Sequence, residues 1–237
     1  MAHANRFKPA SMRPQRDWSC AEPTSPLGPW KFSPRLCPEC ETVDVPILTE
    51  AQLEAALPDI RNSPATGGTL DLIVARPSVD ERALLDEGQL DLAIGLVGDS
   101  WSRRPGPRAA AQPDPERQLT VINARFSRLI GGDSAGAALA GDQLHVDLDL
   151  SEHNAPAGTR LRVGEAVIEI TVPPHTGCQK FSSRFGPTAL RFVNSPVGQA
   201  LHLRGVNARV IVPGRVRVGD PVHIEPPAEV SGTSPPG

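Results

Sequence analysis

The cysteine at position 178 has the surroundings of a functional thiol. Cys178 ends the segment PPHTGC, residues 173–178, directly after a predicted strand. Rigid, irregular loops at the end of a sheet are a usual place for functional side chains. His175, Lys180 and Arg184 lie close by in the sequence. Neighbouring positive charge favours the thiolate, which is the nucleophilic form and a ligand for soft metals. The pattern predicts a reactive thiolate, and a buried, inert cysteine is the alternative.

The other three cysteines, Cys20, Cys37 and Cys40, include a lone C-x-x-C pair. A structural zinc site needs four ligands, and this group offers three thiols. A redox pair needs a helix N-terminus in a βαβ unit, and no such pattern follows. We interpret the pair as incidental, with zinc binding as the alternative. Four cysteines in a chain of this length do not form a disulfide framework, so a cytoplasmic protein is predicted.

Two further features are chemically suggestive. His145 and His153 flank Asp147, Asp149 and Glu152, a pattern that could hold a hard cation. The solvated face of an alternating strand explains the same residues, and we prefer that interpretation. Arginine supplies 21 of the 24 cationic residues. Its planar guanidinium group suits phosphate and other planar anions, which makes an anionic ligand plausible.

Composition limits the class of protein. The chain has 237 residues, enough for one domain of moderate size. Its net charge is −3 and tyrosine is absent, which argues against nucleic-acid binding and base stacking. No apolar run is long enough for a transmembrane helix, so no membrane partner is expected. Residues 1–46 hold eight of the 26 prolines without apolar periodicity. They are predicted to be a disordered tail, as are residues 226–237, which leaves a domain over residues 47–225.

The elements that must position these side chains are mostly strands. Thr49 and Gln52 form a capping box before a short amphipathic helix. Alternation of apolar and polar residues predicts further strands, and helical periodicity predicts short helices. The predicted strands cover residues 70–74, 119–125, 142–150, 206–212 and 215–224, with two more around Gly164 in the run at 159–172. Residues 81–95 are predicted to form one or two short helices ending at Gly95, residues 187–193 another, and residues 103–118 a mobile loop. The expected fold is mainly β, a barrel or a sandwich, with a few short helices.

Several segments together resemble the MOSC domain, which occurs at the C-terminus of molybdenum-cofactor sulfurases and in stand-alone bacterial proteins. The resemblance covers about residues 70–224, and the pieces follow in the family's order and spacing. They are GLVGD at 95–99, GDQ at 141–143, GTRLRVG at 158–164, AVIEIT at 166–171, CQKFSSRF at 178–185, NARV at 207–210 and VGD at 218–220.

The resemblance implies a MOSC-type β-barrel in which Cys178 is the catalytic residue. In this family the cysteine is proposed to carry sulfur as a persulfide or to ligate the molybdenum of a bound pterin cofactor. By the same resemblance, Lys180, Arg184 and Arg209 would bind the cofactor or orient the thiolate, and Arg125 would assist. His175 is predicted to join them in tuning the thiolate and binding the cofactor because it lies close to Cys178 in the sequence. Pyridoxal phosphate belongs to a separate domain of the eukaryotic sulfurases and is not expected here.

The implied function leaves the reaction open. A sulfur-carrier role needs a sulfur donor, such as a desulfurase. A molybdenum-dependent reductase needs an external electron donor, because the chain shows no flavin, haem or iron–sulfur motif. Whether the protein is an enzyme is therefore undecided at this point. The alternative is a non-catalytic β-barrel module that binds an anion or a partner, with Cys178 as a packed side chain.

Overall fold

The computed structural model describes residues 43–104 and 112–225. The predicted tails fall outside these residues, apart from residues 43–46, which have no regular secondary structure, and so do Cys20, Cys37 and Cys40. The middle of the predicted loop at 103–118 is also outside them. Within the described residues, no helix is both long and apolar enough to cross a membrane.

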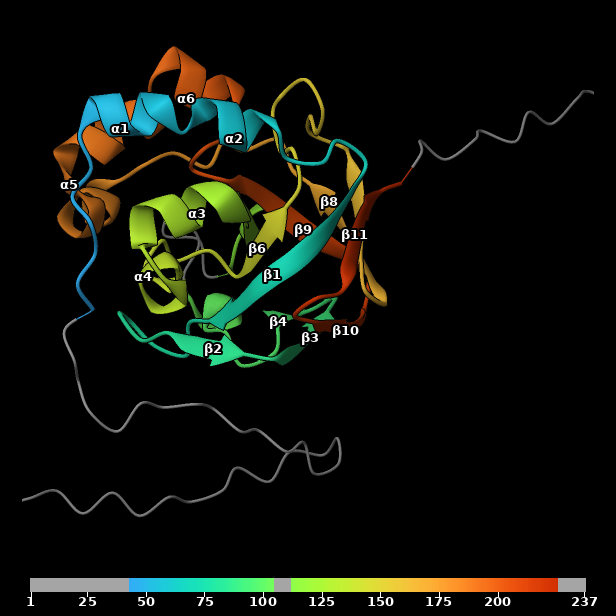
Figure 1. Cartoon of the computed structure of the whole chain (residues 1–237). Helices are drawn as coiled ribbons and strands as arrows, with labels where there is room; N and C mark the ends of the chain where they lie inside the picture. The colour runs from blue at the N-terminus through green and yellow to red at the C-terminus, as the bar shows by residue number, and fades with distance from the viewer. Residues whose placement is uncertain (1–42, 105–111, 226–237) are drawn as a thin grey trace, which may run out of the picture. The chain divides into compact units, whose positions relative to one another are not determined.

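Seven strands form a closed barrel, which confirms the mainly β prediction (Figure 1). Their order is β11-β7-β8-β9-β5-β6-β1, and β1 pairs with β11 to close the ring. Every pair in the ring is antiparallel except β5 with β6. The barrel strands are β1 (Gly67–Ala75), β5 (Leu119–Asn123), β6 (Leu144–Asp147), β7 (Arg160–Val163), β8 (Ala166–Ile170), β9 (Val206–Val212) and β11 (Pro221–Ile224).

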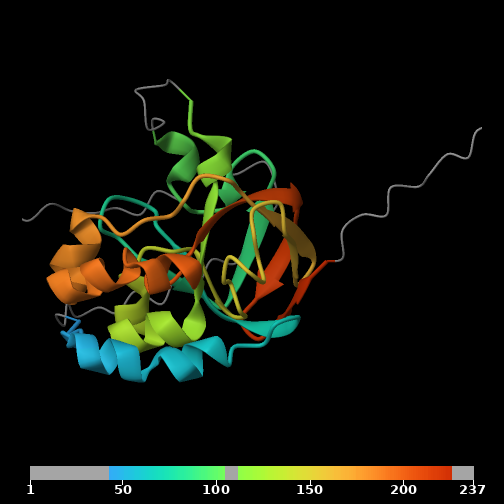
Figure 2. The ribbon, with the colours of Figure 1, turned by 90° about the horizontal axis from the view of Figure 1, so that it is seen from above.

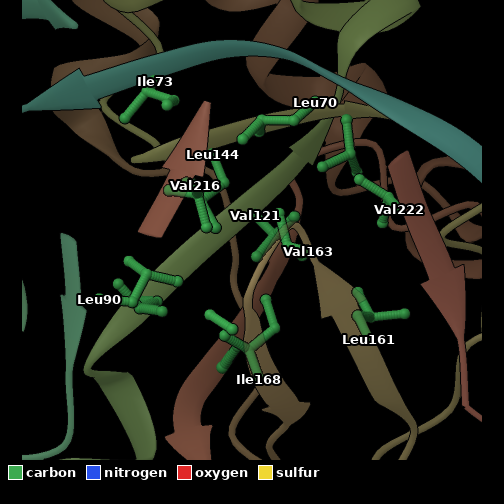
Figure 3. Close-up of a cluster of buried hydrophobic side chains, with 14 of the residues drawn as sticks. Leu70, Ile73, Leu90, Val121, Leu144, Leu161, Val163, Ile168, Val216 and Val222 are labelled. Carbon is green, nitrogen blue, oxygen red and sulfur yellow. The ribbon is translucent and has the colours of Figure 1, made fainter. Parts of the chain in front are cut away.

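The barrel core follows from the alternation of the sequence. In β7, Leu161 and Val163 are buried while Arg160 and Arg162 are exposed, because successive side chains point to opposite faces of a strand. Figure 3 shows Leu161 and Val163 together with Val121 and Ile168 inside the barrel. The predicted inward row of the 142–150 strand, Leu144, Val146, Leu148 and Leu150, is also fully buried in this core.

The prediction of helices over residues 81–95 is wrong. This segment forms β2 (Ala83–Leu85), β3 (Glu87–Asp91) and β4 (Gly95–Leu96). β3 pairs with β10 (Gly214–Arg217), which is more than 120 residues away, and with β4. A short apolar run has no periodicity that separates a strand from a helix, so this distant pairing decides its structure. Gly88 and Leu90 face the core, and a Cβ on Gly88 would lie 2.8 Å from Leu96 Cδ1.

The helices gather on one side of the barrel, where they enclose a second apolar core (Figure 2). The predicted capping box is confirmed, because Thr49 and Gln52 bond each other reciprocally at the start of α1. The predicted strand at 119–125 ends at Asn123, whose side chain accepts from Phe126 N and starts a helix. The helices are α1 (Glu50–Ala55), α2 (Leu57–Arg61), α3 (Ala124–Gly131), α4 (Ser134–Ala138), α5 (Gln179–Val193) and α6 (Pro196–Ala200), with 3₁₀ turns η1 (Trp101–Arg103) and η2 (Pro115–Arg117).

Candidate functional site

Cys178 lies at the end of the loop that joins β8 to α5, residues 171–178, hereafter the Cys178 loop. It is the N-cap residue of α5, and its backbone carbonyl accepts the first helical bond from Ser182 N. The side chain is a free, exposed thiol, which excludes the buried alternative. Within the described residues no hydrogen bond reaches the sulfur. A helix N-terminus also presents unpaired N–H groups and partial positive charge.

The backbone of the Cys178 loop is held at both ends. At its start, Thr171 N donates to the carbonyl of Asn207, and Asn207 Nδ2 donates to the carbonyl of Pro173 (both 2.9 Å). At its end, the side-chain amide of Asn194 bonds the backbone of Gly177. The side chain of Cys178 is therefore free while its backbone is fixed.

His175 faces a buried ion pair. Its Nδ1 lies 3.4 Å from Oδ1 of Asp142, which is completely buried. The other oxygen of Asp142 accepts from Nη1 of Arg204 at 2.7 Å. Burial, reinforced by the charge of Arg204, lowers the pKa of His175 to about 3, so the imidazole is neutral at neutral pH. Burial alone would raise the pKa of Asp142, but the charge and hydrogen bond of Arg204, together with the two neighbouring histidines, hold that pKa below its usual value.

Four arginines converge on one loop opposite His175, the α4–β6 loop (residues 139–143). The last carbonyls of a helix have no partner within the helix, and cationic side chains suit that end. Here four consecutive carbonyls, beginning with the last residue of α4, each accept from a different guanidinium group. The pairs are Arg82 with Ala138 (3.2 Å), Arg184 with Leu139 (2.7 Å), Arg204 with Ala140 (3.0 Å) and Arg76 with Gly141 (2.8 Å).

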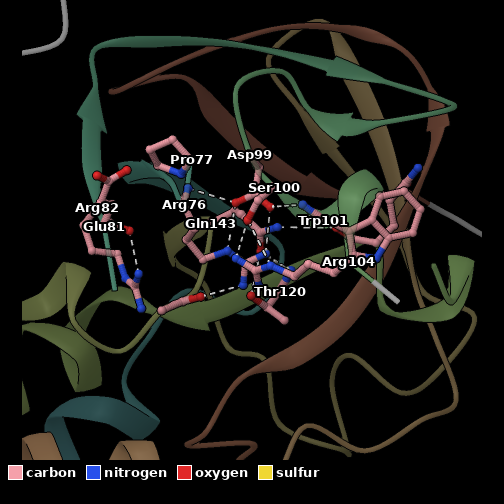
Figure 4. A network of polar contacts seen from close by, with 12 residues as sticks. Arg76, Pro77, Glu81, Arg82, Asp99, Ser100, Trp101, Arg104, Thr120 and Gln143 are labelled. Atoms are coloured by element: carbon pink, nitrogen blue, oxygen red, sulfur yellow. Dashed lines mark hydrogen bonds and ion pairs between the residues drawn. The ribbon is translucent and has the colours of Figure 1, made fainter. Parts of the chain in front are cut away.

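These arginines bring positive charge close to one another. Arg76 is neutralised by Asp99, with Nε–Oδ2 and Nη2–Oδ1 distances of 2.8 and 3.1 Å, as Figure 4 shows. Arg82 has no carboxylate partner among the described residues. Burial, and then repulsion from Arg184 and Arg76, lowers the pKa of Arg82 to about 10. The region therefore carries positive charge that its acidic residues do not fully balance.

Two of the predicted site residues share one carboxylate. Arg184 Nη2 donates to Asp80 at 2.8 Å, and Lys180 Nζ lies 3.7 Å from the same carboxylate oxygen. Arg184 also reaches the α4–β6 loop, to which His175 is joined through Asp142. Lys180 and Arg184 thus meet at Asp80, which partly neutralises them, while His175 and Arg184 both contact the α4–β6 loop.

The other two predicted binding residues lie in separate ion pairs. Arg209 bonds Glu169 at 2.6 Å and Glu116 at 3.2 Å, and both of its acidic partners lie outside the Cys178 loop. Arg125 links α2 to β6 through Asp59 and Asp147. A role for either arginine in cofactor binding stays a prediction.

The acidic cluster near β6 has a structural explanation. His145 is buried, and its Nδ1 lies 2.8 Å from Oγ of Ser127. Burial lowers its pKa to about 4, so this imidazole is neutral as well. Among the described residues, no three His, Cys, Asp or Glu side chains come together as a metal site.

Sequence reasoning did not single out Arg76, Arg82 or Arg204 as part of this region. Their partners are backbone carbonyls 56 to 65 residues away, so no local pattern marks them. The one available signal was Asp142, which belongs to the GDQ segment that carries the resemblance.

Comparison with known proteins agrees with this architecture. Residues 115–223 match the family model of the MOSC domain. This chain contains a MOSC domain. The match begins at η2, and β1, the strand that closes the barrel, precedes the matched residues. No curated protein matches the sequence of the chain.

Solved structures are similar to this chain at low sequence identity. The crystal structure of a hypothetical protein is 20% identical with a TM-score of 0.50, and the alignment covers 72% of each chain. YiiM from Escherichia coli is 22% identical, with a TM-score of 0.44 and coverage of 67% of this chain and 70% of its own. The YUAD protein from Bacillus subtilis is 17% identical, with a TM-score of 0.47 and coverage of 67% and 95%.

Proposed function

We propose that this MOSC domain binds the molybdenum cofactor through Cys178 or carries sulfur for it as a Cys178 persulfide. The observation that carries the proposal is the free, exposed thiol at the N-cap of α5, the helix that also carries Lys180 and Arg184. Either role needs an accessible sulfur, and soft thiolate ligands and sulfane-sulfur chemistry both use the same atom.

The residues present fit a metal that arrives within a cofactor better than a bare metal ion. A bare ion needs three or four protein ligands, and the described residues offer no such group. A metal held by a pterin brings sulfur ligands of its own, so one protein thiolate is enough. Guanidinium groups are suited to the phosphate of such a cofactor because they offer two parallel donors.

In the cofactor-binding form, each residue has a defined task. Cys178 would ligate the metal, while Lys180 and Arg184 would hold the phosphate in exchange for their contacts with Asp80. His175, held neutral beside Asp142, would accept or donate a hydrogen bond without adding charge. When bound, the cofactor supplies redox chemistry that none of these side chains has. An external electron donor is then part of the proposal.

In the sulfur-carrier form, Cys178 exchanges sulfur without net oxidation. The thiolate attacks the outer sulfur of a donor persulfide, such as that of a desulfurase. A new S–S bond forms at Cys178, the donor's S–S bond breaks, and the donor leaves as a thiolate. The terminal sulfur is passed on when an acceptor attacks it and the Cys178 thiolate is released. A free thiol of this kind persists in a reducing compartment, so we place the protein in the cytoplasm.

The decisive experiment is elemental analysis of the full chain purified from a host that makes the cofactor. Wild type, Cys178→Ser and a control, Cys40→Ser, are compared for molybdenum content and, by intact mass, for one added sulfur atom. Molybdenum that is lost only in Cys178→Ser supports the cofactor form. An added sulfur that is lost only in that variant supports the carrier form. If neither signal depends on Cys178, the proposal is wrong and the non-catalytic binding module takes its place.

A further inference from the structure

Helix α5 is broken in its middle. Gly186 has φ 85° and ψ 162°, outside the helical region, and Pro187 follows it. Positive φ suits glycine, and proline has no N–H to continue the hydrogen-bond ladder. The element therefore consists of two short helices, residues 179–185 and 187–193, that meet at an angle.

The break returns the end of α5 to its beginning. A straight helix of 15 residues would be about 22 Å long. Asn194 directly follows α5, and Gly177 lies two positions before the first residue of α5. The two residues are nevertheless in contact. Gly177 N donates to Oδ1 of Asn194 at 3.0 Å, and Nδ2 of Asn194 donates to the Gly177 carbonyl at 3.3 Å. A continuous helix could not make this contact.

The contact with Asn194 holds Gly177 in a closely packed position. A single amide side chain satisfies both the N–H and the C=O of Gly177, as a neighbouring β-strand would. A Cβ on Gly177 would lie 2.7 Å from Leu190 Cδ1 and 2.8 Å from Val193 Cγ2. The second half of α5 therefore forms a surface against which the backbone of Gly177 rests.

We propose that Asn194 is a positioning residue for Cys178. The sulfur of Cys178 has no hydrogen bond within the described residues, so its place is set by the backbone on either side. On one side is the first turn of α5, and on the other is the Gly177 backbone held by Asn194. The importance of the Cys178 position for ligand binding rests on the function proposed above. The contact between Asn194 and Gly177 does not depend on that function.

The test measures the motion of Cys178 directly. A nitroxide label is attached to Cys178 in the full-length chain with Cys20, Cys37 and Cys40 replaced by serine. Its mobility is recorded by electron paramagnetic resonance, and hydrogen exchange of the Gly177 amide is followed in parallel. Asn194→Ala should increase the label's mobility and speed Gly177 exchange about tenfold, since the amide loses its acceptor. Asn194→Asp keeps the acceptor oxygen and loses the donor, so it should restore part of the protection.

Ser195→Ala is the matched control. Ser195 caps α6 by accepting from Gly198 N and donates to the Phe192 carbonyl, but it does not contact Gly177. It therefore weakens the same helix junction without touching the Cys178 loop. The proposal is supported if Asn194→Ala mobilises the label and Ser195→Ala does not. It is overturned if Asn194→Ala leaves the label as immobile as in wild type, or if both variants mobilise it equally.

Molybdenum content, measured on the same variants without the label, separates this inference from the proposed function. A wild-type protein that holds neither molybdenum nor added sulfur contradicts the proposed function, while the mobility data still decide the role of Asn194. If wild type holds molybdenum, we expect Asn194→Ala to lose most of it and Ser195→Ala to keep it.

Discussion

The α4–β6 loop and the Cys178 loop meet at Asp142 and His175, yet they are held in opposite ways. Arginines hold the first through charge-assisted bonds to four consecutive carbonyls. The side-chain amides of Asn207 and Asn194 hold the second through neutral bonds to the backbone. One loop is fixed by charge and the other without it.

The difference explains how an exposed thiol can have a fixed backbone and an unengaged side chain. Carboxylate or guanidinium groups bonded directly to the Cys178 loop would compete with any ligand of the sulfur. Neutral amides fix the backbone and leave the thiol free. The arginines that bond to the α4–β6 loop meanwhile supply positive charge that attracts an anionic ligand. Changes to the charged loop should therefore cost stability, and changes to the neutral loop should mainly affect Cys178.

The largest effect is expected for Arg204→Met. Arg204 is the ion-pair partner of the fully buried Asp142, and its removal leaves a buried charge without compensation. We expect a loss of about 3–5 kcal/mol in the free energy of unfolding, measured by urea denaturation. Asp142→Asn in the same chain should recover part of the loss because the buried charge is then gone. A loss below about 1 kcal/mol would show that water or another group neutralises Asp142.

Two histidines with lowered pKa values, His175 and His145, should make stability depend on pH. Their folded-state pKa values, about 3 for His175 and about 4 for His145, lie below the 6.5 of an unfolded histidine. The unfolded chain therefore takes up protons first as pH falls, so the stabilisation is complete above pH 6.5 and declines below it. Between pH 6.5 and 5 the two histidines together should cost about 3 kcal/mol. His175→Asn should remove about half of this dependence, and an unchanged pH profile would mean that His175 titrates normally in the folded protein.

A smaller effect is expected in the neutral loop. Gly177→Ala places a methyl group against Leu190 and Val193, and Val193 has little freedom to move aside. The expected loss is about 1–3 kcal/mol in urea denaturation. Gly158→Ala is unsuitable as a control because the backbone of Gly158 has a positive φ, which alanine adopts only with strain. Thr176→Ala, the adjacent exposed position of the same loop, should stay within about 0.5 kcal/mol of wild type. Equal losses in both variants would contradict close packing at Gly177.

The sequence was sufficient for features that depend on neighbouring residues. Alternation in the 142–150 segment predicts the row of side chains that faces the barrel interior, and Thr49 with Gln52 predicts the start of α1. Cys178 stands out because its own neighbours, two prolines and a glycine, mark a rigid loop. All of these signals lie within about ten residues of the feature that they predict.

Features that depend on distant partners could not be predicted in the same way. Residues 81–95 are strands because β2 pairs with β1 and β3 pairs with β10 from the other end of the chain. Arg76 and Arg204 bond carbonyls more than 60 residues away. Arg209 looks like a site residue in the sequence, yet its carboxylate partners lie on β8 and η2. Sequence identifies a side chain that can bind an anion, but only the fold decides which carboxylate it meets.

The smallest effect is expected for Arg209→Met, and it tests the remaining sequence prediction. Arg209 is partly exposed and pairs with Glu169 and Glu116, and exposed ion pairs contribute little to stability. We expect a loss below about 1 kcal/mol in urea denaturation, in contrast to Arg204→Met. Molybdenum content of the same variant then decides the cofactor role that the family resemblance implies. A drop in molybdenum without a matching loss of stability would place Arg209 in the binding site with Cys178. Unchanged molybdenum would limit its role to the ion pairs at the barrel wall, because the anion contacts would then come from the charged side chains around the α4–β6 loop alone.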